Sequence, residues 1–172
     1  AGRPVSVFAV ELPKERATIH LDMVFTMIDR DACLVHERSV LGPRRCRVVR
    51  LDADPAGGTR VREVPSLLDG LAEAGLPLEP IVTGGSDPVQ QDREQWLSGA
   101  NSFAFAPGKI LMYSCNPRTL EALDAAGFMV KSARDFIGGG DDPFKYGRLA
   151  VGFEGAELAR GGGGARCMTL PV

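Results

Sequence analysis

The order of turn and helix signals between residues 102 and 131 constrains the fold most strongly. The stretch SFAFAPGKILMYS has a periodicity of two around Pro107-Gly108, which predicts a β-hairpin. In the following NPRTLEALDAAGF, Asn116 is the expected helix N-cap, Pro117 occupies the first helical position and Gly127 ends the helix. With a strand expected up to residue 131, this order is β-β-α-β.

The same order is predicted between residues 47 and 84. Arg47 to Leu51 forms a strand polar enough for a sheet edge, DADPAGGT is a loop, PSLLDGLAEAG is a helix, and PLEPIVTGG is a strand with a glycine turn. Upstream strands are expected over RPVSVFAVEL, over a largely buried segment 18–29, and over Cys33 to His36. We therefore expect an α/β fold built from a repeated module, forming a single domain over residues 1–172.

Three further segments complete the prediction. DPVQQDREQWLSGAN is expected to form a short polar helix closed by Gly99, and IGGGDDPFKYGR a surface loop. The final MTLPV is expected to form one last strand, whereas LAVGFEG indicates no element.

Composition argues against several classes of partner. The chain has 20 basic and 22 acidic residues and a formal net charge of −2, so we expect neither a nucleic acid nor a membrane partner. No apolar run approaches the roughly 20 residues of a membrane span, and the N-terminal stretch lacks the apolar core of a secretory signal. We therefore expect a soluble cytoplasmic protein.

The four cysteines are Cys33, Cys46, Cys115 and Cys167. They are widely spaced, with neither a CxxC pair nor a neighbouring histidine, so no metal site is expected and free thiols are favoured over disulfides.

The ending GGGGARCMTLPV places Cys167 behind four glycines and beside Arg166. A neighbouring cation, Arg166 or a protonated His20, would stabilise a reactive thiolate, although a buried, inert cysteine is the alternative. Glycine runs allow a backbone to approach a ligand closely, and a disordered linker is the other interpretation. The apolar residues after the run favour a hinge that delivers Cys167 to a pocket.

His20 and Asp22 lie two residues apart on the strand predicted over 18–29. Alternate side chains of a strand project from one face, so both could act on one ligand. The alternative is a structural histidine that is satisfied within the protein.

Four long motifs carry a resemblance to a known family. In order and at similar spacing, IHLDMVFTMIDRD, DREQWLSGANSFAFAPGKI, NPRTLEALDAAGF and GGGGARCMTLPV resemble the C-terminal part of bacterial arginine deiminase. The resemblance covers nearly the whole chain, whereas the family enzyme is more than twice as long and forms a five-bladed α/β propeller of the pentein type. It implies a partial propeller of about two to two-and-a-half ββαβ blades.

The resemblance also implies a chemistry. Cys167 matches the nucleophile that attacks the guanidinium carbon of L-arginine, giving citrulline and ammonia through a covalent amidino intermediate. His20 matches the general acid and base, and Asp22 a carboxylate that binds the guanidinium. Arg166 or Arg160 is expected near the substrate carboxylate, and no metal or organic cofactor is expected.

Other groups of the family's pocket have no counterpart in this sequence. A second guanidinium-binding aspartate and the glutamate that pairs with the histidine belong to upstream blades. We therefore expect the chain alone to bind arginine poorly and to need the N-terminal portion of the enzyme or a second subunit. We also expect an oligomer. The alternatives are a non-catalytic assembly or regulatory module and another guanidine-modifying hydrolase or amidinotransferase.

Overall fold

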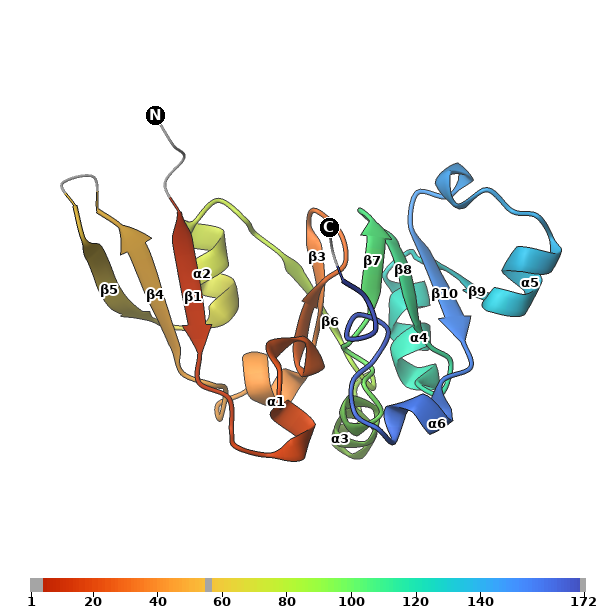
Figure 1. The fold of residues 1–172 in the computed structure, drawn as a ribbon, viewed down its shortest axis with the longest axis horizontal. Coiled ribbons are helices and arrows are strands. Elements are labelled where there is room, and N and C mark those ends of the chain that lie inside the picture. Colours follow the sequence, from red (N-terminus) through yellow and green to blue (C-terminus); the bar gives the residue numbers. More distant parts are fainter. Residues whose placement is uncertain (1–4, 55–56, 171–172) are drawn as a thin grey trace.

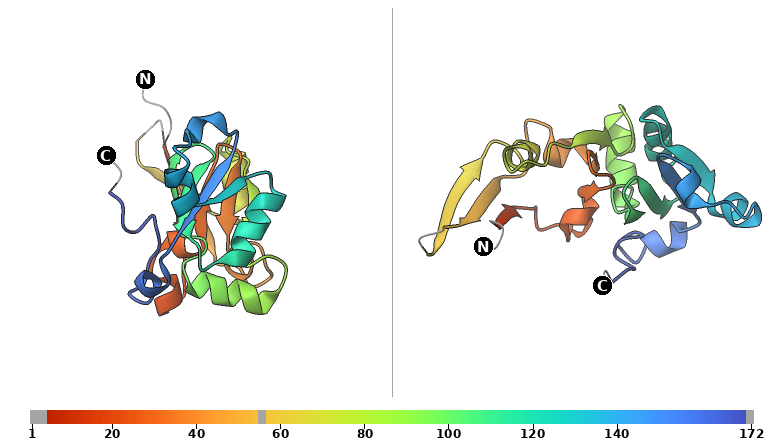
Figure 2. Two further views of the ribbon diagram at one scale, coloured as in Figure 1. Left: turned by 90° about the vertical axis from the view of Figure 1, so that its right-hand side faces the viewer. Right: turned by 90° about the horizontal axis from the view of Figure 1, so that it is seen from above.

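The computed structural model describes residues 5–54 and 57–170 as a mixed α/β structure with three separate sheets side by side (Figure 1). Seen from above, the chain follows an open arc (Figure 2). Helices α3 (Pro88–Trp96) and α4 (Pro117–Ala125) lie on one side of the arc, and the C-terminal segment lies on the other. This arrangement leaves the C-terminal segment on the face that α3 and α4 do not cover.

The first sheet is antiparallel, with the order β1-β4-β5: β1 (Ser6–Val10), β4 (Val48–Ala53) and β5 (Thr59–Val64). The strand predicted over RPVSVFAVEL is confirmed from Ser6, while Arg3 and Pro4 lie outside the described residues. The predicted edge position of residues 47–51 is wrong, because β4 lies between two neighbours. Its polar side chains are partnered instead, as Arg50 Nε donates to Asp52 Oδ1 at 2.8 Å.

The second sheet combines β2 (Phe25–Met27), β3 (Ala32–Val35) and β6 (Glu79–Val82). β3 is antiparallel to β2 and parallel to β6. The prediction that residues 47–84 form one module is therefore wrong in its pairing: β6 joins β3, while β4 and β5 join β1. The helix predicted in this stretch is confirmed as α2 (Leu67–Glu73), which packs on the first sheet, and the short α1 (Glu37–Val40) follows β3.

The third sheet confirms the module predicted over residues 102–131. It has the order β7-β8-β10-β9, and its members are β7 (Phe103–Ala106), β8 (Lys109–Tyr113), β9 (Met129–Ser132) and β10 (Leu149–Phe153). The stretch LAVGFEG supplies β10, which is parallel to both neighbours. The predicted surface loop contains the end of α5 (Ala133–Gly138) and the short helix η3 (Pro143–Lys145), and α6 (Ala156–Ala159) follows β10.

The largest apolar cluster joins the second and third sheets. Leu34 from β3, Ile110 and Met112 from β8, and Leu123 from α4 are fully buried in it. Helix α4 is held by Glu94 of α3, a buried carboxylate that accepts hydrogen bonds from the backbone N–H groups of Arg118 and Thr119 at 2.9 and 2.8 Å. Asn116 occupies the N-cap position as predicted, but its side chain makes no capping bond, because Glu94 already takes the free N–H groups.

The strand predicted over residues 18–29 is wrong for most of its length. The chain forms two short 3₁₀ helices, η1 (Arg16–Thr18) and η2 (Leu21–Met23), before β2 begins at Phe25. The buried amide of Gln95 donates to the carbonyls of Ala17 and Met23 at 2.5 and 3.2 Å. These carbonyls are therefore satisfied by a side chain of α3 instead of a neighbouring strand.

The final strand predicted over MTLPV is also wrong within the described residues. The backbone N–H and hydroxyl of Thr169 both donate to the Arg166 carbonyl, at 3.0 and 2.7 Å. These local bonds close a turn and leave no extended ladder, while Pro171 and Val172 lie outside the described residues.

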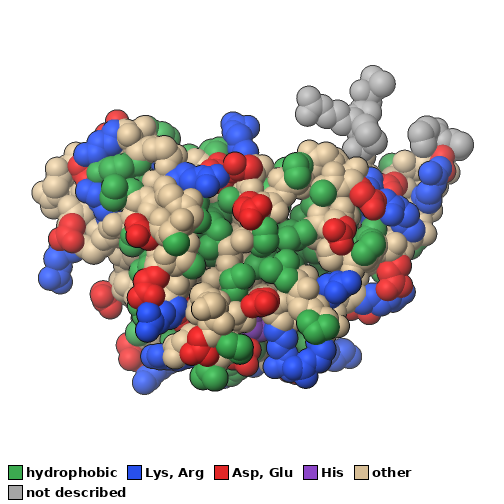
Figure 3. Space-filling view, turned by 180° about the vertical axis from the view of Figure 1, so that it is seen from behind, with side chains coloured by type: hydrophobic (Ala, Val, Ile, Leu, Met, Phe, Trp, Pro, Cys, Tyr) green, Lys and Arg blue, Asp and Glu red, His purple; other side chains and the backbone are tan. Residues whose placement is uncertain are grey.

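Charges of both signs are distributed over the surface. Seen from behind, acidic and basic side chains are interspersed around an apolar centre (Figure 3), in keeping with the near-neutral composition. Among the described helices, none has both the length and the apolar character required to cross a bilayer.

Candidate active site

The glycine run near the C-terminus folds tightly against the start of β7. Gly163 has a φ of +80°, and a Cβ placed on it would lie 2.8 Å from the Cβ of Cys167. A Cβ on Gly164 would lie 2.5 Å from the carbonyl oxygen of Asn101. Both positions therefore require glycine, and this second half of the run is packed in place instead of forming a loose linker.

Asn101 connects this run to the rest of the protein. Its fully buried side chain accepts hydrogen bonds through Oδ1 from the N–H groups of Gly164 and Cys167, at 3.0 and 3.2 Å. Its Nδ2 donates to Cys167 Sγ at 3.0 Å. Sequence reasoning missed Asn101, although it lies in the motif DREQWLSGAN, because its partners are more than 60 residues away and leave no local signal.

Cys167 is exposed, and its sulfur faces Asp22. The distances from Sγ to the two carboxylate oxygens are 3.6 and 3.8 Å. The structure thus brings together two predicted site residues that are far apart in the sequence. Cys33, in contrast, is a buried and unreactive cysteine. Burial, with a smaller contribution from Glu79, raises the pKa of its thiol to about 12.

Asp22 lies in η2 and is also approached by Arg166. The distance from Arg166 Nε to Asp22 Oδ2 is 3.6 Å, and the two side chains are 48% and 20% exposed. Arg166 therefore contacts the carboxylate that the family resemblance assigns to a guanidinium ligand. Asp22 is the point at which the sulfur and a guanidinium group meet.

His20 is the N-cap residue of η2 and is exposed. The strand geometry predicted for His20 and Asp22 is wrong, yet both residues line one open depression of about 430 Å³ together with Arg166. Within the described part of the chain, the imidazole of His20 makes no hydrogen bond to Cys167 or to any other group. The structure therefore places His20 near Asp22 without fixing its ring.

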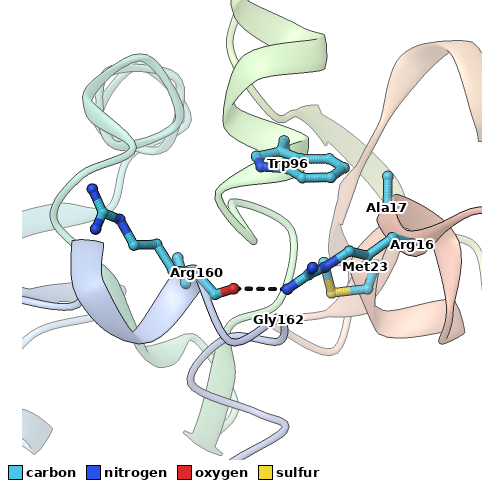
Figure 4. A pocket seen from close by; sticks show the side chains of 7 residues that line it. Arg16, Ala17, Met23, Trp96, Arg160 and Gly162 are labelled. Carbon is cyan, nitrogen blue, oxygen red and sulfur yellow. Dashed lines mark hydrogen bonds between the residues drawn. The ribbon is translucent and has the colours of Figure 1, made fainter.

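Arg160 is not brought to this depression. Its guanidinium pairs with Glu157 at 3.1 Å, and its carbonyl accepts a hydrogen bond from Arg16 Nη2 at 2.8 Å. Figure 4 shows that its side chain points away from Arg16 and from the neighbouring pocket beside Trp96.

The donor groups of the chain do not assemble into a metal centre in the described ranges. Across residues 5–54 and 57–170, no group of three or more histidine, cysteine, aspartate or glutamate side chains is arranged to hold a metal ion. A thiol, a carboxylate and an imidazole, as in Cys167, Asp22 and His20, are side-chain types that serve in enzymes as a nucleophile, an anionic binding group and a base.

Comparison with known proteins identifies a family. The family model described as arginine deiminase matches residues 2–172. Arginine deiminases from Oenococcus oeni, Clostridium perfringens and Lactococcus lactis subsp. cremoris are 31%, 32% and 33% identical over 169 residues, which are 97% of this chain. The chain spans 36% of the length of these relatives and corresponds to a C-terminal part of them.

Proposed function

The chain belongs to the arginine deiminase family, and from this premise we propose that it supplies the cysteine, histidine and aspartate side of an active site that hydrolyses L-arginine to L-citrulline and ammonia. The observation that carries this proposal is the 3.6 Å approach of Cys167 Sγ to the Asp22 carboxylate. A guanidinium held by that carboxylate would lie directly beside the sulfur.

In the proposed reaction, Asp22 binds the planar guanidinium by charge-assisted hydrogen bonds. The Cys167 thiolate attacks the central carbon, and protonated His20 gives its proton to the leaving nitrogen, so ammonia departs and an amidino-cysteine remains. His20 then takes a proton from a water molecule, which attacks the same carbon. The C–S bond breaks, the remaining hydroxyl proton passes to solvent, citrulline leaves and the thiolate is restored.

Of the two arginines considered for the substrate carboxylate, we retain Arg166. It lines the depression with Asp22 and His20, whereas Arg160 is paired with Glu157 and directed elsewhere. Because Arg166 rests on Asp22, an incoming guanidinium must replace it there. The displaced Arg166 is then available to the carboxylate end of the substrate.

We further propose that the chain is a partial propeller of two to two-and-a-half blades. The second and third sheets support this proposal, because each pairs an antiparallel hairpin with a parallel strand that follows it in the chain. The remaining pocket groups would come from an N-terminal portion or a second subunit, in keeping with the 36% of the relatives' length that the chain spans. The chain alone would then bind arginine poorly, because one carboxylate gives an incomplete clamp.

The experiment measures citrulline from arginine with the 172-residue chain alone and with the upstream segment of a relative added. We expect turnover only in the mixture, and its loss in Cys167→Ser and Asp22→Asn. Intact mass with a slow amidine substrate should show an adduct on Cys167. Absence of both turnover and adduct in the mixture would refute the enzymatic proposal.

The same measurements test a non-catalytic assembly module. The observation that favours this second candidate is an exposed apolar row on the first sheet, where Val7 and Val61 are 55% and 60% exposed and flank Leu51. A stable complex with the upstream segment that forms no adduct on Cys167 would favour the module.

A further inference from the structure

We propose that Asn101 is a further catalytic residue of this site: Nδ2 donates an N–H to the sulfur of Cys167 and stabilises its thiolate, while Oδ1 holds the loop that carries it. The inference rests on the proposed role of Cys167 as the nucleophile. Asn101 is the last residue of the motif DREQWLSGAN. The inference gives this motif a chemical role, in addition to the structural roles of its residues Glu94 and Gln95.

The orientation of the Asn101 amide follows from its partners. The backbone N–H groups of Gly164 and Cys167 can only donate, so the group that faces them at 3.0 and 3.2 Å must be the carbonyl oxygen. The opposite orientation would place NH₂ hydrogens against two N–H groups. The NH₂ group must therefore face the two sulfur atoms, Sγ of Cys167 at 3.0 Å and Sδ of Met23 at 3.8 Å.

The shorter contact, at 3.0 Å, is made to Cys167 Sγ, which can lose a proton and become an anion, whereas the thioether sulfur of Met23 cannot. A hydrogen bond to a charged acceptor is stronger than one to a neutral acceptor, so the donor favours the thiolate over the thiol. Asn101 is fully buried and its other polar atoms are engaged, which fixes the donor before any substrate arrives. Because Cys167 is exposed, its proton leaves to water.

The other charged and titratable groups around Cys167 do not replace this contact. Asp22 opposes a negative sulfur at 3.6 Å, and Arg166 is engaged with Asp22. Tyr113 is a weak acid here, because burial, followed by the charges of Cys115 and Cys167, raises the pKa of its phenol. His20 lines the depression beside Asp22. Asn101 is therefore the neutral donor that favours the anion without itself changing charge.

The first test measures the alkylation of Cys167 by iodoacetamide as a function of pH, with the modified residue identified by peptide mass spectrometry. Asn101→Ala removes the N–H donor without adding a charge. We expect the midpoint of its pH profile to rise by about one unit, which is a roughly tenfold smaller thiolate fraction below the midpoint. Asn101→Asp keeps acceptor oxygens for the loop, but it also places a carboxylate beside the sulfur, so its midpoint should rise further. A purely structural Asn101 predicts an unchanged profile in Asn101→Ala, and that result would overturn the proposal.

Cys33 controls for folding in these variants, because it is fully buried and should stay unmodified in a folded chain. A second measurement needs no substitution of Asn101. The chain contains two asparagines, Asn101 and Asn116, so ¹⁵N-asparagine labelling gives two side-chain amides. Asn116 is a matched control, because it is equally buried but donates to the carbonyl of Leu97 at 3.1 Å. Its own contact to a sulfur, Cys115 Sγ, is longer at 3.8 Å, and burial raises the pKa of that thiol.

We expect the Asn101 amide resonances to shift with the same pH midpoint as the alkylation of Cys167, while those of Asn116 stay fixed. The shift should persist in His20→Gln and disappear in Cys167→Ser. Asn101 resonances that stay fixed while Cys167 titrates would overturn the proposal. Neither measurement depends on arginine turnover, so a failure to form citrulline would refute the proposed function separately.

Discussion

The packing of the terminal glycine run predicts opposite outcomes for two neighbouring alanine substitutions. In Gly164→Ala, the new methyl group would lie 2.5 Å from the carbonyl oxygen of Asn101 and 2.8 Å from its Oδ1. The first of these is a backbone atom that cannot rotate away. In Gly161→Ala, the methyl group would meet the Leu158 carbonyl at 3.4 Å, and Gly161 has no positive φ. Gly161→Ala is therefore the matched control from the same run.

The free-energy cost of Gly164→Ala cannot exceed the energy that holds the terminal loop, residues 163–167, against Asn101. Overpacking of this kind costs about 1–3 kcal/mol. The loop can avoid the clash by releasing the two hydrogen bonds to Asn101 Oδ1, which contribute about 1 kcal/mol each. A loss of about 2 kcal/mol corresponds to a roughly 30-fold shift toward the released loop. Gly161→Ala should leave this equilibrium almost unchanged.

Amide hydrogen exchange of Cys167 measures this equilibrium directly. Its side chain is exposed, but its N–H is bonded to Asn101, so protection reports the docked loop. We expect protection of the Cys167 amide to fall about 30-fold in Gly164→Ala, which corresponds to the loss of the two hydrogen bonds to Asn101 Oδ1. Protection should stay at the original value in Gly161→Ala. Equal protection in both variants would show that the glycine requirement has been misjudged.

Three further predictions concern stability. Glu94→Ala leaves buried donors at the start of α4 without an acceptor. It should lower the free energy of unfolding by about 3–5 kcal/mol, measured by urea titration with an unchanged m value. Glu94→Gln keeps one acceptor oxygen and should lower the free energy of unfolding by less. Burial lowers the pKa of His36 below its usual 6.5, so its stabilising contribution is complete above that pH and is lost as the pH falls through the lowered pKa. His36→Gln should flatten this dependence in acid unfolding curves, and an unchanged slope would contradict this. Arg148→Met removes the ion pairs to Asp29 and Asp31 in the turn between β2 and β3, but it should cost only about 1 kcal/mol in thermal unfolding, and less in high salt, because the Arg148 side chain is 30% exposed. A larger, salt-independent loss would contradict this.

Local signals predicted the elements that local physics determines. Proline at the first helical position and a glycine terminator located α4, and the Pro107-Gly108 turn located the β7–β8 hairpin. Strand partners were harder to predict, because pairing depends on distant segments. Nothing in residues 47–84 indicates that β4 will pair with β1 or that β6 will lie beside β3.

In the candidate site, too, residue types could be predicted from the sequence, whereas contacts between distant segments could not. The residue types suggested that Cys167 could be a nucleophile and that His20 and Asp22 could act on one ligand. The family resemblance assigned His20 as acid and base and Asp22 as a guanidinium-binding carboxylate, and it suggested that the three meet. The predicted strand around His20 was wrong because Gln95, a residue of a later helix, bonds the carbonyls of Ala17 and Met23. Asn101 had no sequence signal, because its role depends on contacts to a loop 63 and 66 residues away.

The contact between Asp22 and Cys167 spans 145 residues of the chain. Contacts of such separation carry a loop-closure cost that local hairpins and helices do not, so we expect this contact to form after them. A molecule with native secondary structure but an undocked terminal segment would carry the thiol far from its carboxylate. Crosslinking between these two side chains would therefore report the completion of folding, whereas circular dichroism would register the earlier stages.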